Sequence, residues 1–158
     1  MVDTIPEKHR KNVVTDLPRG VQIKGHLQPA PCWITPDMLP GVGFRMAGHE
    51  MSGSVGKPHA APHVHDVPEI WAAPSEKKGD LVIEAEMNDG RFLVEAPFSI
   101  FIPAGTRHCF TVVKCESTHY VMGIVLLDWR EPRSIPPKGR RQGEASSIGV
   151  ANEKTLLE

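Results

Sequence analysis

The stretch HVHDVPE, residues 63 to 69, contains two histidines that flank one valine, with a glutamate four residues after the second histidine. Side chains alternate between the two faces of a strand, so His63 and His65 are expected on one side while the residue between them faces away. Imidazoles and carboxylates bind first-row divalent metals, and Glu69 can supply the carboxylate once the chain has turned at the intervening proline. The stretch therefore predicts three ligands of a metal site.

A fourth ligand is expected from PAGTRH, residues 103 to 108. The proline and glycine of this stretch form a turn that can aim the following strand back into the same cavity. His108, directly after that turn, is the best candidate for the remaining ligand.

Together the two stretches resemble the metal motifs of the cupin family, HxHxxxE followed by PxGxxH. The resemblance implies a single-domain cupin-type β-barrel (double-stranded β-helix or jelly roll), with His63, His65, Glu69 and His108 as metal ligands inside it. The alternative is a cupin fold whose site holds no metal.

The composition supports an all-β fold independently of the motifs. Fifteen prolines and fourteen glycines make long helices improbable. Residues 81–87 and 91–96, separated by Asn-Asp-Gly, predict a β-hairpin, because the first segment alternates apolar and acidic side chains. Further strands are expected at 41–51, 63–65, 69–73, 98–102, 108–114 and 119–129. Many short strands are typical of a sandwich or barrel.

The length of 158 residues fits one domain. The barrel is expected over residues 36–129, with an N-terminal arm over 1–35 and a C-terminal tail over 130–158. Both ends mix charged residues and proline, and we expect them to wrap over the domain or a neighbouring subunit, or to be disordered. A homodimer is expected because the edge strands of the barrel need covering.

The net charge of -1 gives no general attraction to nucleic acid or anionic lipid, so neither is an expected partner. No stretch approaches the roughly 20 apolar residues that cross a bilayer, and no signal peptide is recognised at the start. We expect a cytoplasmic protein with reduced thiols and a small-molecule substrate.

Three further residues are candidates for direct roles at the site. His59 lies four residues before His63 and could bind substrate, support a ligand or lie in a solvated loop. His119 and Tyr120 begin an apolar segment, and by alternation one of them could face the cavity as an acid, base or hydrogen-bond donor. Together with the predicted ligand Glu69, His119 and Tyr120 are the catalytic candidates.

The pocket wall is expected to include Trp71 and Phe110, which share strand faces with Glu69 and His108 but could equally be ordinary core residues. Arg45 and Arg107 could anchor a substrate carboxylate, although Arg107 lies in a turn and is expected to face solvent. Cys109 should point away from His108, which makes it a poor nucleophile.

Three imidazoles and one carboxylate leave two of the six positions in an octahedral shell for exchangeable ligands. We expect one divalent transition metal per chain, with iron, manganese or nickel favoured over zinc because no sulfur ligand is present. The resemblance implies an enzyme, a dioxygenase-type oxidoreductase in the first place. A redox-neutral isomerase, cyclase, lyase or decarboxylase is the first alternative, and a non-catalytic metal-binding or ligand-binding cupin is the second.

Overall fold

The computed structural model describes residues 5–23, 29–88 and 90–130. Short strands are the main regular structure of this part of the chain, which also contains one short helix, α1 (Glu7–Arg10), and one 3-10 turn, η1 (Ser52–Ser54). The strands are β1 (Arg19–Val21), β2 (Ala30–Ile34), β3 (Arg45–Glu50), β4 (Glu69–Ala73), β5 (Leu81–Met87), β6 (Gly90–Glu95), β7 (Phe98–Ile102), β8 (His108–Cys115) and β9 (Tyr120–Val125). The predicted all-β fold is confirmed.

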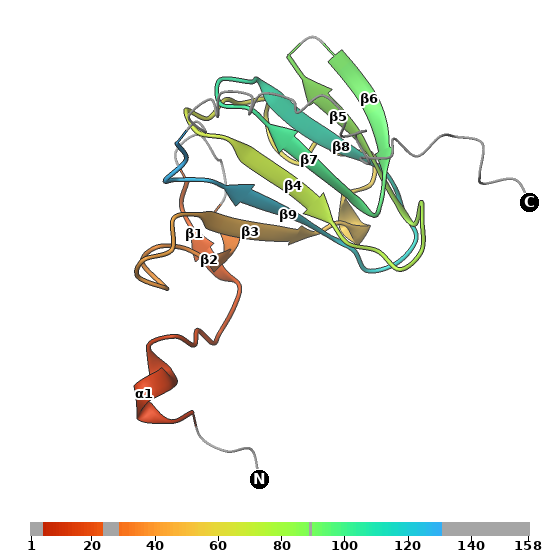
Figure 1. The fold of residues 1–158 in the computed structure, drawn as a ribbon. Coiled ribbons are helices and arrows are strands. Elements are labelled where there is room, and N and C mark those ends of the chain that lie inside the picture. Colours follow the sequence, from red (N-terminus) through yellow and green to blue (C-terminus); the bar gives the residue numbers. More distant parts are fainter. Residues whose placement is uncertain (1–4, 24–28, 89, 131–158) are drawn as a thin grey trace, which may run out of the picture.

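Hydrogen bonding divides the strands into two antiparallel sheets (Figure 1). One sheet has six strands in the order β1-β2-β3-β9-β4-β7, and the other has three in the order β6-β5-β8. The two sheets face each other across the core, as expected for a jelly roll, and within the described ranges no strand ladder joins them.

The core lies between these sheets. Trp71 of β4 and Val121 of β9 pack with Ile83 of β5 and with Phe110 and Val112 of β8, and all five side chains are buried. Fully burying a side chain of this size contributes roughly 1.5–3 kcal/mol. The alternating burial along β4 and β5 is the pattern expected of strands that face a core on one side only.

The predicted hairpin is confirmed as β5 and β6, which pair from Val82↔Glu95 to Met87↔Gly90. Asn88 adopts a positive φ of 52° in the turn, as a tight hairpin turn requires. The strand expected at 63–65 does not form. His63 instead makes an isolated bridge with His108, one of three such bridges between residues 55–63 and β8.

The strands expected at 41–51 and 119–129 are shorter, covering 45–50 and 120–125. The N-terminal segment provides β1 and β2 to the six-stranded sheet, so part of the expected arm is sheet. The boundary at residue 36 stays a prediction, and all but Arg130 of the expected tail lies outside the described residues. No helix in the described part of the chain is long and apolar enough to span a membrane.

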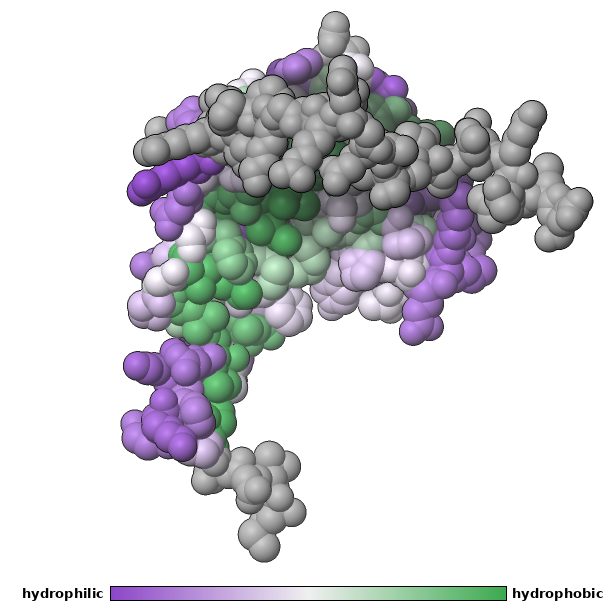
Figure 2. All heavy atoms as spheres, viewed as in Figure 1, coloured by the Kyte–Doolittle hydropathy of each residue, from purple (hydrophilic) through white to green (hydrophobic). Residues whose placement is uncertain are grey.

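The six-stranded sheet is also apolar on the side away from the core. Met46, Ile124, Ile70 and Phe101 are register partners across β3, β9, β4 and β7, and Phe101 is 49% exposed. In the same view as Figure 1, Figure 2 shows hydrophobic residues gathered over the middle of the molecule with hydrophilic residues on both sides.

Candidate metal centre

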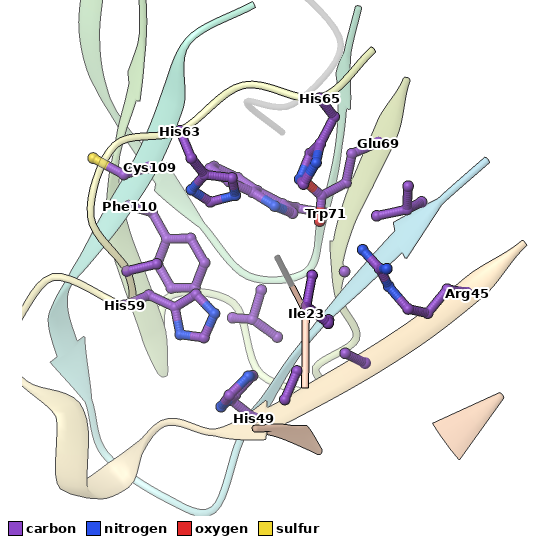
Figure 3. Close-up of a pocket in the computed structure, with 16 residues that line it drawn as sticks. Ile23, Arg45, His49, His59, His63, His65, Glu69, Trp71, Cys109 and Phe110 are labelled. Atoms are coloured by element: carbon purple, nitrogen blue, oxygen red, sulfur yellow. The ribbon is translucent and has the colours of Figure 1, made fainter. Parts of the chain in front are cut away.

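The four predicted ligands form one cluster. Figure 3 shows three of them, His63, His65 and Glu69, close together at one side of a pocket. His63 and His65 lie on the segment before β4, Glu69 is the first residue of β4, and His108 is the first residue of β8. One nitrogen or oxygen atom from each of the four lies within 4.8 Å of the others. The pairing of the His63 and His108 backbones, with N···O distances of 3.1 and 2.9 Å, holds the segment before β4 against β8.

Backbone carbonyls orient two of the imidazoles. Nδ1 of His63 lies 2.8 Å from the carbonyl oxygen of Ala61, and Nδ1 of His108 lies 2.8 Å from that of Thr106. A proton on Nδ1 satisfies each contact and makes Nε2 the candidate ligand atom. Burial also lowers the pKa of His63, which favours the neutral ring that binds metals.

The carboxylate of Glu69 lies between two imidazoles. Its Oε2 is 3.1 Å from Nε2 of His108 and 3.4 Å from Nε2 of His65. Burial by itself raises the pKa of Glu69, but hydrogen bonds from His108 and His65 outweigh that effect and lower the pKa to about 2. Glu69 is therefore an anion at neutral pH.

The surroundings of His108 favour a cation at this position. Its side chain is only 1% exposed, and both ring nitrogens face acceptors, the Thr106 carbonyl and the Glu69 carboxylate. A neutral imidazole carries one N–H and can satisfy only one of them. A metal between Nε2 and the carboxylate would take the place of the second proton.

The distances between the ligand atoms also fit a bound metal. Ligand atoms about 2.1 Å from a metal and at right angles to each other lie roughly 3 Å apart. The contacts of Glu69 at 3.1 and 3.4 Å are close to that separation. The residues present thus fit a first-row divalent metal held by three imidazoles and one carboxylate.

The cluster faces a pocket with a cavity volume of about 50 Å³, enough for a few water molecules. His63, His65 and Glu69 line it together with Arg45, His49, His59, Trp71 and Phe110 (Figure 3). A wider hollow shares His49, His59 and Cys109 with this pocket. The pocket thus suits a small molecule or the narrow end of a larger one.

Four predicted pocket residues lie where they were expected. His59 stacks on Phe110 with ring centroids 4.6 Å apart, and Trp71 contacts the rings of both Phe110 and His108 edge-on. Trp71 and Phe110 line the pocket and also belong to the buried core, so each has both of the positions considered for it. Arg45 reaches into the pocket from β3 (Figure 3).

The structure does not bring His119 and Tyr120 to the cluster. Strand β9 runs toward the cluster, because Val125 at its far end pairs with Glu69 while Tyr120 pairs with Glu50. Five residues of strand separate the two ends by roughly 17 Å. His119 contacts Ser117, and Tyr120 packs edge-on against Trp33 on the outer face, so neither lines the pocket as a catalytic group.

Arg107 and Cys109 lie outside the cluster, as expected from their positions. Arg107 is exposed and forms a 2.6 Å ion pair with Glu86. Cys109 projects away from His63 (Figure 3), and burial followed by the nearby charge of Glu86 raises its pKa. The raised pKa keeps the thiol protonated at neutral pH, which disfavours a nucleophilic role.

His49 also lines the pocket, with its ring centroid 4.2 Å from that of His59, although it was not among the predicted site residues. The sequence pattern could have identified His49. Arg45, Ala47 and His49 occupy alternate positions of one predicted strand, so their side chains share a face, and if Arg45 faces the pocket then His49 does too.

No family model and no curated protein matches the chain. Solved structures similar to it include a cupin 2 conserved barrel domain protein from Salinispora arenicola CNS-205, with 18% identity, a TM-score of 0.46, and coverage of 65% of this chain and 76% of that one. A cupin 2 domain-containing protein from Halorhodospira halophila has 14% identity and a TM-score of 0.49, covering 65% and 66%. A crystal structure of Fe(II) HppE has 14% identity and a TM-score of 0.45, covering 61% and 48%.

At these identities and TM-scores, the candidate metal centre rests on the four side chains of this chain and their geometry.

Proposed function

We propose that this chain is a metal-dependent enzyme of the cupin type, and in the first place a dioxygenase-type oxidoreductase acting on a small organic substrate. His63, His65, Glu69 and His108 would hold the metal, and the pocket beside them would take the substrate. A bound divalent metal would supply Lewis acidity and, for iron or manganese, electron transfer to dioxygen.

The observation that carries the proposal is the orientation of the ligand rings next to a pocket. Carbonyl oxygens engage Nδ1 of His63 and of His108, which directs the other nitrogen of each ring to the cluster. A purely structural metal site is usually closed by protein ligands, whereas three of these ligands also line a cavity. Substrate can therefore approach the position where the metal would lie.

The residues around the cluster have roles of their own in this proposal. Trp71 and Phe110 are buried and present ring faces and edges that exclude water from the substrate. Glu69 offsets one positive charge of the metal and accepts hydrogen bonds from His108 and His65 when no metal is bound.

A second candidate function is redox-neutral chemistry, such as isomerisation or decarboxylation. The observation that favours it is the pair His49 and His59, two imidazoles in the pocket with ring centroids 4.2 Å apart. Imidazoles near neutral pH can take up and deliver the protons that such reactions require.

Metal replacement separates the two functions. The protein is purified without chelators or a histidine tag, its metal content is measured, and dicarbonyl and catecholic substrates are screened for oxygen uptake with iron and then with zinc bound. A dioxygenase consumes oxygen with iron only, whereas a redox-neutral enzyme forms product without oxygen uptake. Purified protein that holds no metal after incubation with iron, manganese, nickel and zinc would contradict the proposal.

A further inference from the structure

Arg45 has no anionic partner among the described residues, unlike Arg91 and Arg107 of the other sheet and its adjoining turn. Arg107 pairs with Glu86 at 2.6 Å, and Arg91 pairs with the same carboxylate at 2.9 Å. Among the described residues, Arg45 makes no ion pair or hydrogen bond, although its side chain is half-buried and lines the pocket. A guanidinium removed from water without a partner is costly, which suggests that the pocket normally contains one.

The sheet register places Arg45 directly across from a metal ligand. Arg45 pairs with Val125 of β9, and Val125 pairs on its other side with Glu69 of β4. The three residues form one row across neighbouring strands, and all three line the pocket. Two strand spacings put the backbones of Arg45 and Glu69 about 10 Å apart, so their side chains reach toward a common space.

The charges of the pocket favour an anion. Glu69 is its one acidic side chain among the described lining residues, and its carboxylate is already engaged by His65 and His108. A divalent metal in the cluster would leave the pocket with an excess of positive charge. Guanidinium groups recognise carboxylates through two parallel hydrogen bonds.

We propose that Arg45 binds a carboxylate group of the substrate, and that the substrate class is a small carboxylic acid whose second oxygen donor reaches the metal. This inference rests on the proposed function only in the contact between the substrate and the metal. The small cavity limits the acid to a short chain, or to a short acidic end of a longer molecule that extends into the wider hollow. Trp71 and Phe110 would contact its carbon skeleton.

Binding to metal-loaded protein tests this assignment. Calorimetry compares pyruvate, lactate, oxalate, malonate and succinate with the neutral amides of the same acids, on zinc-loaded protein whose metal content is measured in parallel. We expect at least one acid to bind at least about tenfold more tightly than its amide. Arg45→Met should remove that preference while metal content and amide binding stay within about twofold of wild type.

Two variants control for general effects. Arg107→Met removes an arginine outside the pocket and should leave acid binding unchanged. Arg45→Lys keeps the charge but not the fork of donors and should bind the acid with intermediate affinity. Folding of each variant is checked by its thermal unfolding curve.

Acid binding that is as tight in Arg45→Met as in wild type, with metal content intact, would overturn the assignment. So would a panel in which no acid binds better than its amide. If wild type takes up no metal, the proposed function fails, but the role of Arg45 is still tested. Acid binding is then compared between metal-free wild type and metal-free Arg45→Met. The role of Arg45 stands only if the variant binds the acid more weakly.

Discussion

Gly123 makes room for the carboxylate of Glu69. The two residues lie on neighbouring strands, and a Cβ atom on Gly123 would be 2.7 Å from Oε1 of Glu69, closer than such atoms approach in proteins. The glycine on β9 thus determines where a ligand on β4 can lie. Trp71 lies 4.0 Å from the same Cβ position, an ordinary van der Waals distance, so the close approach is to Glu69.

Gly123→Ala is therefore expected to weaken metal binding, by roughly the 10- to 100-fold that loss of groups supporting a metal ligand typically costs. Gly53→Ala is the matched control, because nothing lies within 4 Å of the Cβ position at Gly53. Zinc titration against a competing chelator measures both affinities. Equal affinity of Gly123→Ala and wild type would show that Glu69 is not held where the structure places it.

His63→Ala and His108→Ala should each lose most of the bound metal, because each removes an oriented imidazole from the cluster. His108→Ala should also lower the unfolding temperature, since the ring is buried and its removal leaves a cavity. His9→Ala, in the exposed helix α1, serves as the control. Metal content is measured after gel filtration, and wild-type content in both cluster variants would remove these residues from the site.

Glu69→Gln keeps the shape of the side chain but removes its charge. We expect the variant to bind metal more weakly yet measurably, and to lose at least about tenfold in turnover, a barrier increase of roughly 1.4 kcal/mol. Glu76→Gln, an exposed change outside the pocket, should affect neither quantity. Both quantities are measured on one preparation, and unchanged values for Glu69→Gln would mean that Glu69 only closes a turn.

The thiols should react slowly in the folded protein. Burial is the largest effect on Cys32 and Cys109, and it raises the pKa of both. A raised pKa keeps the thiol protonated until the pH exceeds the ordinary value near 9, so alkylation by iodoacetamide at pH 7.5 should be at least about tenfold slower than in urea. Mass spectrometry of the alkylated peptides provides the rates, and rapid native labelling of Cys109 would contradict its placement.

A homodimer stays a prediction, and light scattering at micromolar concentrations tests it. The outer row of Met46, Ile124, Ile70 and Phe101 is the apolar surface that a second copy would cover. Phe101→Glu should then give a monomer, whereas Leu93→Glu, at an exposed position on β6, should not. A monomeric mass for wild type would exclude the dimer.

The ligand set could be predicted from the sequence because it depends on local rules. His63 and His65 both belong to the cluster, as their spacing predicted, although the strand assumed for that prediction does not form. The turn after Pro103 delivers His108 to the same place, and the hairpin of β5 and β6 follows from an alternating segment and a turn sequence. Each inference depends on a short segment and an adjacent turn, where backbone geometry is strongly restricted.

The positions of residues across the pocket from the ligands depend on non-local strand pairing. Gly123 belongs to the site, and the predicted Arg45 lies across from Glu69, because β3, β9 and β4 are neighbours in one register. The same register places His119 at the far end of β9. Strands distant in the sequence pair according to the packing of the whole core, and a change of register or strand order leaves every local pattern intact. The metal ligands could therefore be predicted from local sequence patterns, whereas the rest of the pocket depends on which distant strands pair.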